Sequence, residues 1–138
     1  MIKQAAFITE DIFNSREYIL HMPVDSTAFH MRSKMWIENE QGKVVFGLGR
    51  YRILDSIQRL GSLNAAAQEL KMSYRAIWGR ITATEDRIGK PLLVRGSRGS
   101  SLTPLAESLL KQFRRMRTIV EAEADEVFKD LMAAYLDG

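Results

Sequence analysis

The residues best suited to chemistry lie in one short run, SYRAIWGRIT, at positions 73–82. Its aromatic, guanidinium and hydroxyl side chains can hydrogen-bond to base edges and neutralise phosphates. Steps of three and four place most of them on one side of a helix, away from its apolar residues. That side carries Tyr74, Arg75, Trp78, Gly79 and Thr82, with Arg80 near its edge. Such a face suits contact with the major groove of a duplex.

Two helices joined by a tight turn must position this face. Ser62 can cap a first helix over residues 63–70, and three small alanines there let another helix cross closely. Lys71 and Met72 form the turn, and Ser73 opens a second helix. The core side of that helix is expected to carry Ile77, Ile81, Thr84 and Ile88. This pattern predicts a helix-turn-helix.

A β-hairpin and a further helix are predicted ahead of it. Apolar residues flank a polar stretch within residues 34–47, where Gly42 can adopt the positive φ of a tight connection. A helix over residues 50–60 should end at Gly61. Arg50 and Arg52 should point outward, toward either phosphates or solvent. The expected core stripe of this helix is Ile53, Leu54, Ile57 and Leu60.

Residues 91–103 predict a second hairpin, the wing. Its first strand is expected over residues 92–94, its flexible tip over 96–100 and its return over 101–103. Arg95 and Arg98 would contact the minor groove or phosphates. The alternative is a generic loop without a ligand. Trp78 also has two interpretations, contact with sugar or a thymine methyl, and burial against the wing.

A long helix should follow Thr103 as cap and Pro104 as first residue, and continue to about residue 136. Thirty residues of helix span about 45 Å, more than so small a domain covers. The simplest partner is the same helix of a second copy, antiparallel, because its first half is basic and its second half acidic. The residues expected at this homodimer interface are Leu109, Phe113, Met116, Val120, Val127 and Leu131.

Charge is concentrated in the middle of the chain. Residues 50–117 hold fourteen Lys and Arg against five Asp and Glu, a net charge of +9. Residues 1–49 and 118–138 carry −1 and −5. A basic block inside a folded segment is typical of proteins that bind double-stranded DNA.

Other classes of function find little support. The chain has no cysteine, and its two histidines, His21 and His30, do not cluster, so we expect no metal site and no cofactor. The sequence contains no paired acids, activated nucleophile or phosphate loop that would suggest an enzyme. Gly47 and Gly49 lack the third glycine of a dinucleotide fingerprint. No apolar run approaches the roughly 18 residues of a membrane span. We expect a cytoplasmic protein.

The stretch from Arg50 to Glu107 resembles the winged helix-turn-helix of LysR-type transcriptional regulators. The shared pattern is GSLNAAAQEL, then MS and an apolar-spaced helix, then IGKPLLVR, a Gly/Ser/Arg turn and SLTP. WIEN, VVFGLGR and MSYRAIW point to the DNA-binding domain of molybdate-dependent, ModE-type regulators within this group. Both families carry effector or oxyanion-binding domains that this sequence does not include, so molybdate sensing is not transferred to it.

The resemblance implies a set of residues at the DNA surface. Arg75 is the best candidate for bidentate recognition of guanine, and Ser73 for both capping its helix and admitting a phosphate. The full set is Ser62, Asn64, Ser73, Tyr74, Arg75, Trp78, Arg80, Thr82, Arg95, Ser97, Arg98 and Ser100.

The predicted fold is mainly α (α+β), a winged helix-turn-helix with an N-terminal β-hairpin and a long C-terminal dimerisation helix. Residues 1–32 form an extension with a weak helix over about 10–21. Two interpretations of this extension remain open: Met31 is an alternative translation start, or the extension is a functional arm that covers a dimer surface. Residues 33–103 bind DNA and 104–138 dimerise. The predicted function is sequence-specific DNA binding that regulates transcription. The alternatives are a winged-helix protein-interaction module and a non-specific architectural DNA binder.

Overall fold

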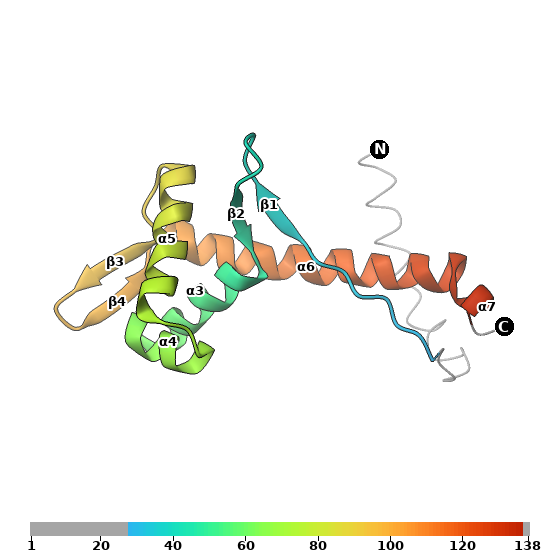
Figure 1. The fold of residues 1–138 in the computed structure, drawn as a ribbon, viewed down its shortest axis with the longest axis horizontal. Helices are drawn as coiled ribbons and strands as arrows, with labels where there is room; N and C mark the ends of the chain where they lie inside the picture. Colours follow the sequence, from blue (N-terminus) through green and yellow to red (C-terminus); the bar gives the residue numbers. More distant parts are fainter. Residues whose placement is uncertain (1–27, 137–138) are drawn as a thin grey trace. The chain divides into compact units, whose positions relative to one another are not determined.

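The computed structural model describes residues 28–136, so the helix predicted over residues 10–21 lies outside the described part. Residues 34–115 form one compact unit, and the described residues 28–33 and 116–136 belong to a second. The first unit holds two hairpins and three short helices (Figure 1). In chain order its elements are β1 (Trp36–Glu38), β2 (Val44–Gly47), α3 (Leu48–Leu60), α4 (Leu63–Leu70), α5 (Tyr74–Ile88), β3 (Leu93–Gly96) and β4 (Gly99–Leu102).

The first hairpin confirms the prediction for residues 34–47. β1 and β2 pair antiparallel, with Trp36 opposite Gly47 and Ile37 opposite Phe46. The side chain of Asn39 accepts hydrogen bonds from the backbone N–H groups of Gln41 and Lys43 at 3.0 and 2.9 Å. Gly42 has φ +75°, a conformation that costs glycine little. The hydrogen bonds described for this turn therefore come from its own residues.

The helix-turn-helix also forms as predicted, because each helix end is capped. Ser62 accepts from the N–H of Ala65, and Ser73 from that of Ala76, each at 3.0 Å. Lys71 takes the left-handed conformation at the C-terminus of α4, with φ 54°. Its N–H and that of Met72 satisfy carbonyl groups of the last turn. These caps fix where α5 starts.

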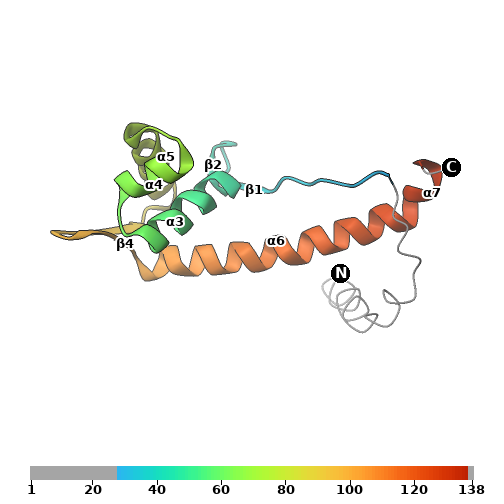
Figure 2. The same cartoon turned by 90° about the horizontal axis from the view of Figure 1, so that it is seen from below.

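Aliphatic side chains of α3, α4 and α5 pack with Phe46 of β2 in one core. Phe113, from the helix α6 (Pro104–Leu131), completes it: its ring lies 5.1 Å from that of Phe46 and 5.7 Å from that of Tyr51. Figure 2 shows α3 between α5 and the first turns of α6. The prediction that Leu60 belongs to the core is wrong, because at the last position of α3 it is 44% exposed.

The wing is a tighter hairpin than predicted. β3 and β4 pair from Leu93 opposite Leu102 to Gly96 opposite Gly99, which leaves only Ser97 and Arg98 as the turn. The expected five-residue tip is therefore wrong, since its glycines are paired. The N–H of Ser100 donates to the carbonyl of Gly61 at 3.0 Å, which joins β4 to the turn after α3.

The long helix begins where predicted and ends earlier. Thr103 caps α6, because its hydroxyl accepts from the N–H of Ala106 at 3.2 Å. The helix ends at Leu131, and a separate short helix, α7 (Ala133–Leu136), follows Met132. The prediction of one helix to about residue 136 is wrong there, although no glycine or proline marks the break.

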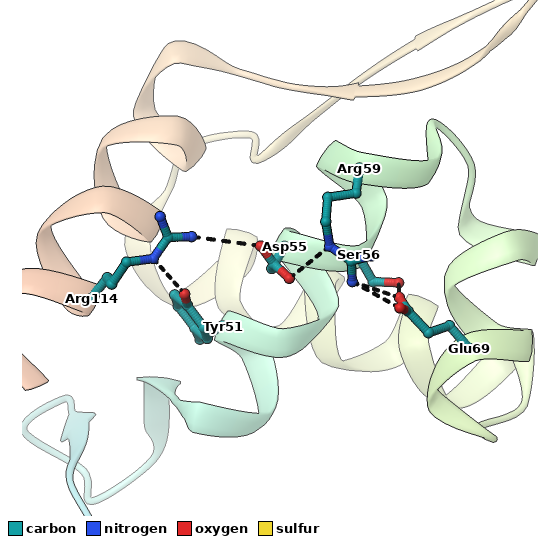
Figure 3. A network of polar contacts seen from close by, with 6 residues as sticks. All are labelled: Tyr51, Asp55, Ser56, Arg59, Glu69 and Arg114. Atoms are coloured by element: carbon teal, nitrogen blue, oxygen red, sulfur yellow. Dashed lines mark hydrogen bonds and ion pairs between the residues drawn. The ribbon is translucent and has the colours of Figure 1, made fainter.

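A polar network ties α3 to α4 (Figure 3). Arg59 donates to both carboxylate oxygens of Glu69, at 2.9 and 2.8 Å, and to Asp55 at 3.0 Å. The buried Ser56 donates to Glu69 as well. The bond from Arg59, and then that from Ser56, holds the pKa of Glu69 below its ordinary value. The network fixes the first helix of the helix-turn-helix on its support.

The same network reaches α6. Arg114 donates from Nε to the hydroxyl of Tyr51 at 2.7 Å and lies 3.6 Å from the carboxylate of Asp55. Its hydrogen bond with Tyr51 is the main cause of a raised pKa for Arg114. Figure 3 shows these contacts running from α6 to α4 through α3. The start of the long helix is thus attached to the helix-turn-helix by polar as well as apolar contacts.

Candidate nucleic-acid interface

The first turns of α5 present the predicted face. Ser73, Tyr74, Arg75, Gly79 and Arg80 are exposed, with Tyr74 at 47%. Backbone N–H groups in the first turn of a helix have no partner within that helix, and the helix dipole favours an anion beside them. Ser73 satisfies one of them. The N-terminus of α5 therefore combines side chains that can contact bases with a favourable position for a phosphate.

Thr82 is less available than predicted. It is half-buried, and its hydroxyl donates to the carbonyls of Trp78 at 2.9 Å and Gly79 at 3.2 Å. A hydroxyl engaged with its own helix has no proton left for a base. Its oxygen lone pairs and methyl group remain for weaker contacts.

Trp78 packs against the wing, the alternative that the sequence left open. The guanidinium of Arg95, on β3, lies 3.6 Å from the centre of its ring, well within cation–π range. The indole is half-buried against the core. Trp78 thereby holds Arg95 beside the recognition helix, although a guanidinium stacked by its face keeps its N–H edge for a phosphate.

The wing and the start of α4 place the remaining predicted residues. Ser97 and Arg98 form the exposed turn of the wing, whereas Ser100 is half-buried and its backbone holds Gly61. On α4, Asn64 is exposed, while the hydroxyl of Ser62 caps the helix. Ser62 and Ser100 therefore also have structural roles.

The arginines of this surface differ from those of the polar network. The ion pairs of the described residues engage Arg59, Arg114 and Arg117, and none of them involves the arginines of α5 or the wing. Positive charge without a carboxylate in an ion pair with it attracts an anionic ligand. The uncompensated arginines at the predicted surface are Arg75, Arg80, Arg95 and Arg98.

Sequence reasoning missed one part of this region. Thr84, expected only as a core residue, is fully buried and accepts a hydrogen bond from Arg50 Nε at 2.7 Å. It donates in turn to the carbonyl of Val45 at 2.8 Å. Arg50 is thus half-buried beside α5, not fully outward as expected. The only sequence feature that could have indicated this contact is a threonine among the isoleucines of the core stripe.

The residues predicted for the dimer interface fall into two groups. Leu109 is half-buried against the core, and Phe113 is only 4% exposed. The prediction for Phe113 is corrected: it is a core residue, because β2 and Tyr51 cover it. The exposed members follow Phe113 along α6 and are Met116, Val120, Val127 and Leu131.

Neither a metal-binding cluster nor a membrane-spanning helix is found in the described residues. Among residues 28–136, no cluster of three His, Cys, Asp or Glu side chains could hold a metal ion. No helix in the same range is long and apolar enough to cross a membrane.

Comparison with known proteins gives concordant matches. The model of the family "bacterial regulatory helix-turn-helix protein, lysR family" matches residues 48–107. The molybdenum transport protein ModE of Azotobacter vinelandii is 28% identical over 110 residues, covering 76% of this chain and 40% of that protein. The transcriptional regulator ModE of Haemophilus influenzae is 38% identical over 69 residues, covering 46% and 27%.

A solved structure, the DNA-binding domain of CbnR in complex with DNA, is similar with a TM-score of 0.51 and 26% identity. The match covers 59% of this chain and 94% of the CbnR domain. The chain spans two fifths or less of the lengths of the two ModE relatives. The similarity to them therefore concerns one part of each protein.

Proposed function

Because residues 48–107 form a LysR-family helix-turn-helix domain, we propose that the chain binds double-stranded DNA in a sequence-specific manner and regulates transcription. The observation that carries the proposal is the exposed face of α5, where Tyr74 and Arg75 stand at a capped helix start beside the wing. The similar CbnR domain was solved with DNA, which supports the same use of this fold. Such a regulator would act in the cytoplasm, where bacterial DNA lies.

Each part of the surface has a role in this proposal. α5 enters the major groove, Arg75 donates to O6 and N7 of a guanine, and Tyr74 contacts the backbone or a neighbouring base. Arg95, held on Trp78, and Arg98 at the wing turn bind the flanking phosphates or minor groove. Ser62, Asn64 and Ser97 add hydrogen bonds to the backbone. Base contacts specify the site, and phosphate contacts position the protein.

The proposal includes a homodimer, with residues 33–103 binding DNA and residues 104–138 dimerising. Val127 and Leu131, 53% and 64% exposed, continue the apolar stripe of α6 beyond the core residues. An antiparallel partner helix would cover this stripe and bring its acidic half beside the basic half of the first copy. Two recognition helices would then bind two half-sites together.

Fluorescence anisotropy tests this function. The purified chain is titrated against duplex DNA from upstream of its own gene and against a scrambled duplex, from about 50 to 200 mM salt. Arg75→Ala should lose about 1–3 kcal/mol of discrimination between the two duplexes. Lys34→Gln, at an exposed position ahead of β1 and outside both proposed surfaces, is the control for loss of one positive charge.

Each other outcome selects an alternative. Binding without preference for either duplex would indicate an architectural DNA binder. No binding at the lowest salt, with the chain folded, would contradict the proposal and favour a winged-helix protein-interaction module.

A further inference from the structure

A second group of arginines lies beside α5, on the side facing β2 and the start of α3. Arg50, in the first turn of α3, donates to Thr84 on α5, and Thr84 donates to Val45 on β2. Arg87, one turn after Thr84, donates from Nη1 to the carbonyl of Val44. The guanidinium of Arg87 is thus anchored on β2 directly, and that of Arg50 through Thr84, at neighbouring residues of the strand.

Arg80 belongs to the same group, because it precedes Thr84 by four residues and so lies one helical turn away on the same side of α5. Its exposed side chain has no anchoring contact of its own among the hydrogen bonds of the described residues. Burial, and then the charges of Arg87 and Arg80, lower the pKa of Arg50. The three positive charges are therefore close enough to repel one another.

No ion pair offsets this repulsion within the described part of the chain. None of its ion pairs includes any of the three arginines. The first turn of α3 has no acidic residue, and Glu85 accepts from the N–H of Leu92 at 2.7 Å. Three guanidiniums on one side of α5, two of them anchored and none in an ion pair, are suited to a phosphate, which can accept several charge-assisted hydrogen bonds.

The position of the group relative to the wing indicates which phosphate. Figures 1 and 2 show the wing on one side of α5 and β2 on the other. A helix in the major groove is bordered by both sugar–phosphate strands. If the wing reaches one strand, the arginines on the opposite side of α5 face the other.

We propose that Arg50, Arg80 and Arg87 form a phosphate-binding site that holds the DNA backbone on the side of α5 opposite the wing. This inference rests on the proposed function, since it needs α5 to lie in the groove. Thr84 is a positioning residue, because it holds Arg50 in place without reaching the ligand. The site carries no sequence information and adds affinity equally for every duplex.

Salt dependence tests the site. Arg80→Gln removes one charge and none of the hydrogen bonds found in the described residues, and a second variant combines it with Arg87→Gln. Each lost phosphate contact should lower the slope of log Kd against log salt by about one, equally for the upstream and scrambled duplexes. Discrimination between the two duplexes should not change. Slopes equal to that of the control Lys34→Gln would overturn the site but leave the proposed function standing, whereas a parent chain that binds no duplex would overturn both.

Neutral methylphosphonates, placed one at a time along the duplex backbone, identify the ligand. Replacing the phosphate in the site should weaken the parent and leave the double variant unaffected at that position. A free anion is tested separately by the melting temperature in inorganic phosphate and in chloride at equal ionic strength. Two results together would assign the site to a free anion and overturn the DNA assignment. Phosphate would stabilise the parent but not the double variant, and the two chains would have the same slope of log Kd against log salt for the duplexes.

Discussion

At the scale of single residues, glycines illustrate how position decides function. Gly99 has φ +127°, and a Cβ there would lie 2.4 Å from the carbonyl oxygen of Gly61. Gly79, in the middle of α5, has no heavy atom within 4 Å of where its Cβ would be. Gly99 permits the close approach of β4 to the turn after α3, whereas a side chain at Gly79 would project into open space.

Opposite effects follow for the two alanine variants. Gly99→Ala should destabilise the chain by more than about 1 kcal/mol, because the added methyl forces β4 away from Gly61. Gly79→Ala should stabilise it by about 1 kcal/mol through helix propensity. Denaturant unfolding measures both. Equal effects of the two substitutions would contradict the close packing of the wing.

Glu69 should make stability depend on pH. Arg59 and Ser56 lower its pKa in the folded chain, so its contribution to stability is complete above the ordinary carboxyl value of about 4.3. That contribution is lost as pH falls through the lowered folded value. Glu69→Gln should therefore be less stable at pH 7 and show a flatter decline of melting temperature from about pH 5 downward. A decline as steep as that of the parent, or of an exposed-residue control such as Glu40→Gln, would exclude this role.

At the scale of elements, the parts predicted best depend on neighbours in sequence. The caps at Ser62 and Ser73, the turn at Gly42 and the strand pairing around it need only a few adjacent residues. The parts predicted poorly depend on distant ones. No local pattern indicates that Arg95 stacks on Trp78, or that Arg50 binds Thr84, because each contact joins elements brought together by the whole fold.

The long helix shows the same limit. One apolar stripe runs along α6, but Phe113 fills the core of the domain while Leu131 is exposed. Periodicity predicts the stripe but cannot distinguish its buried part from its exposed part, since only the other elements determine where the core ends. In the proposed dimer, the helix therefore has two functions along a single stripe.

Two variants should separate those functions. Phe113→Ala should destabilise the domain by about 3–5 kcal/mol, because it leaves a cavity beside Phe46. Leu131→Glu should preserve the fold but weaken the dimer at least about tenfold, since it places a charge in an apolar interface. Sedimentation equilibrium and thermal unfolding measure the two effects. A monomeric parent chain, or a dimer indifferent to Leu131→Glu, would contradict the proposed role of α6.

At the scale of the whole molecule, charge and apolar surface are distributed as the proposed function requires. The basic block of residues 50–117 contains the helix-turn-helix, and the exposed apolar residues of α6, except Met116, lie after it. Binding of two half-sites by a dimer multiplies affinity, because the second contact becomes intramolecular. Affinity should thus depend on both surfaces, while sequence preference depends on α5 alone.

Selection of bound duplexes from a random pool, with the parent chain and Arg75→Ala selected in parallel, tests sequence-specific recognition through α5. The parent should enrich an inverted repeat whose half-site centres are about 10 base pairs, or one helical turn, apart. Arg75→Ala should relax the preference for guanine at one position in each half-site. A pool that stays random after selection, although the protein is folded and binds duplex DNA, would contradict sequence-specific recognition through α5.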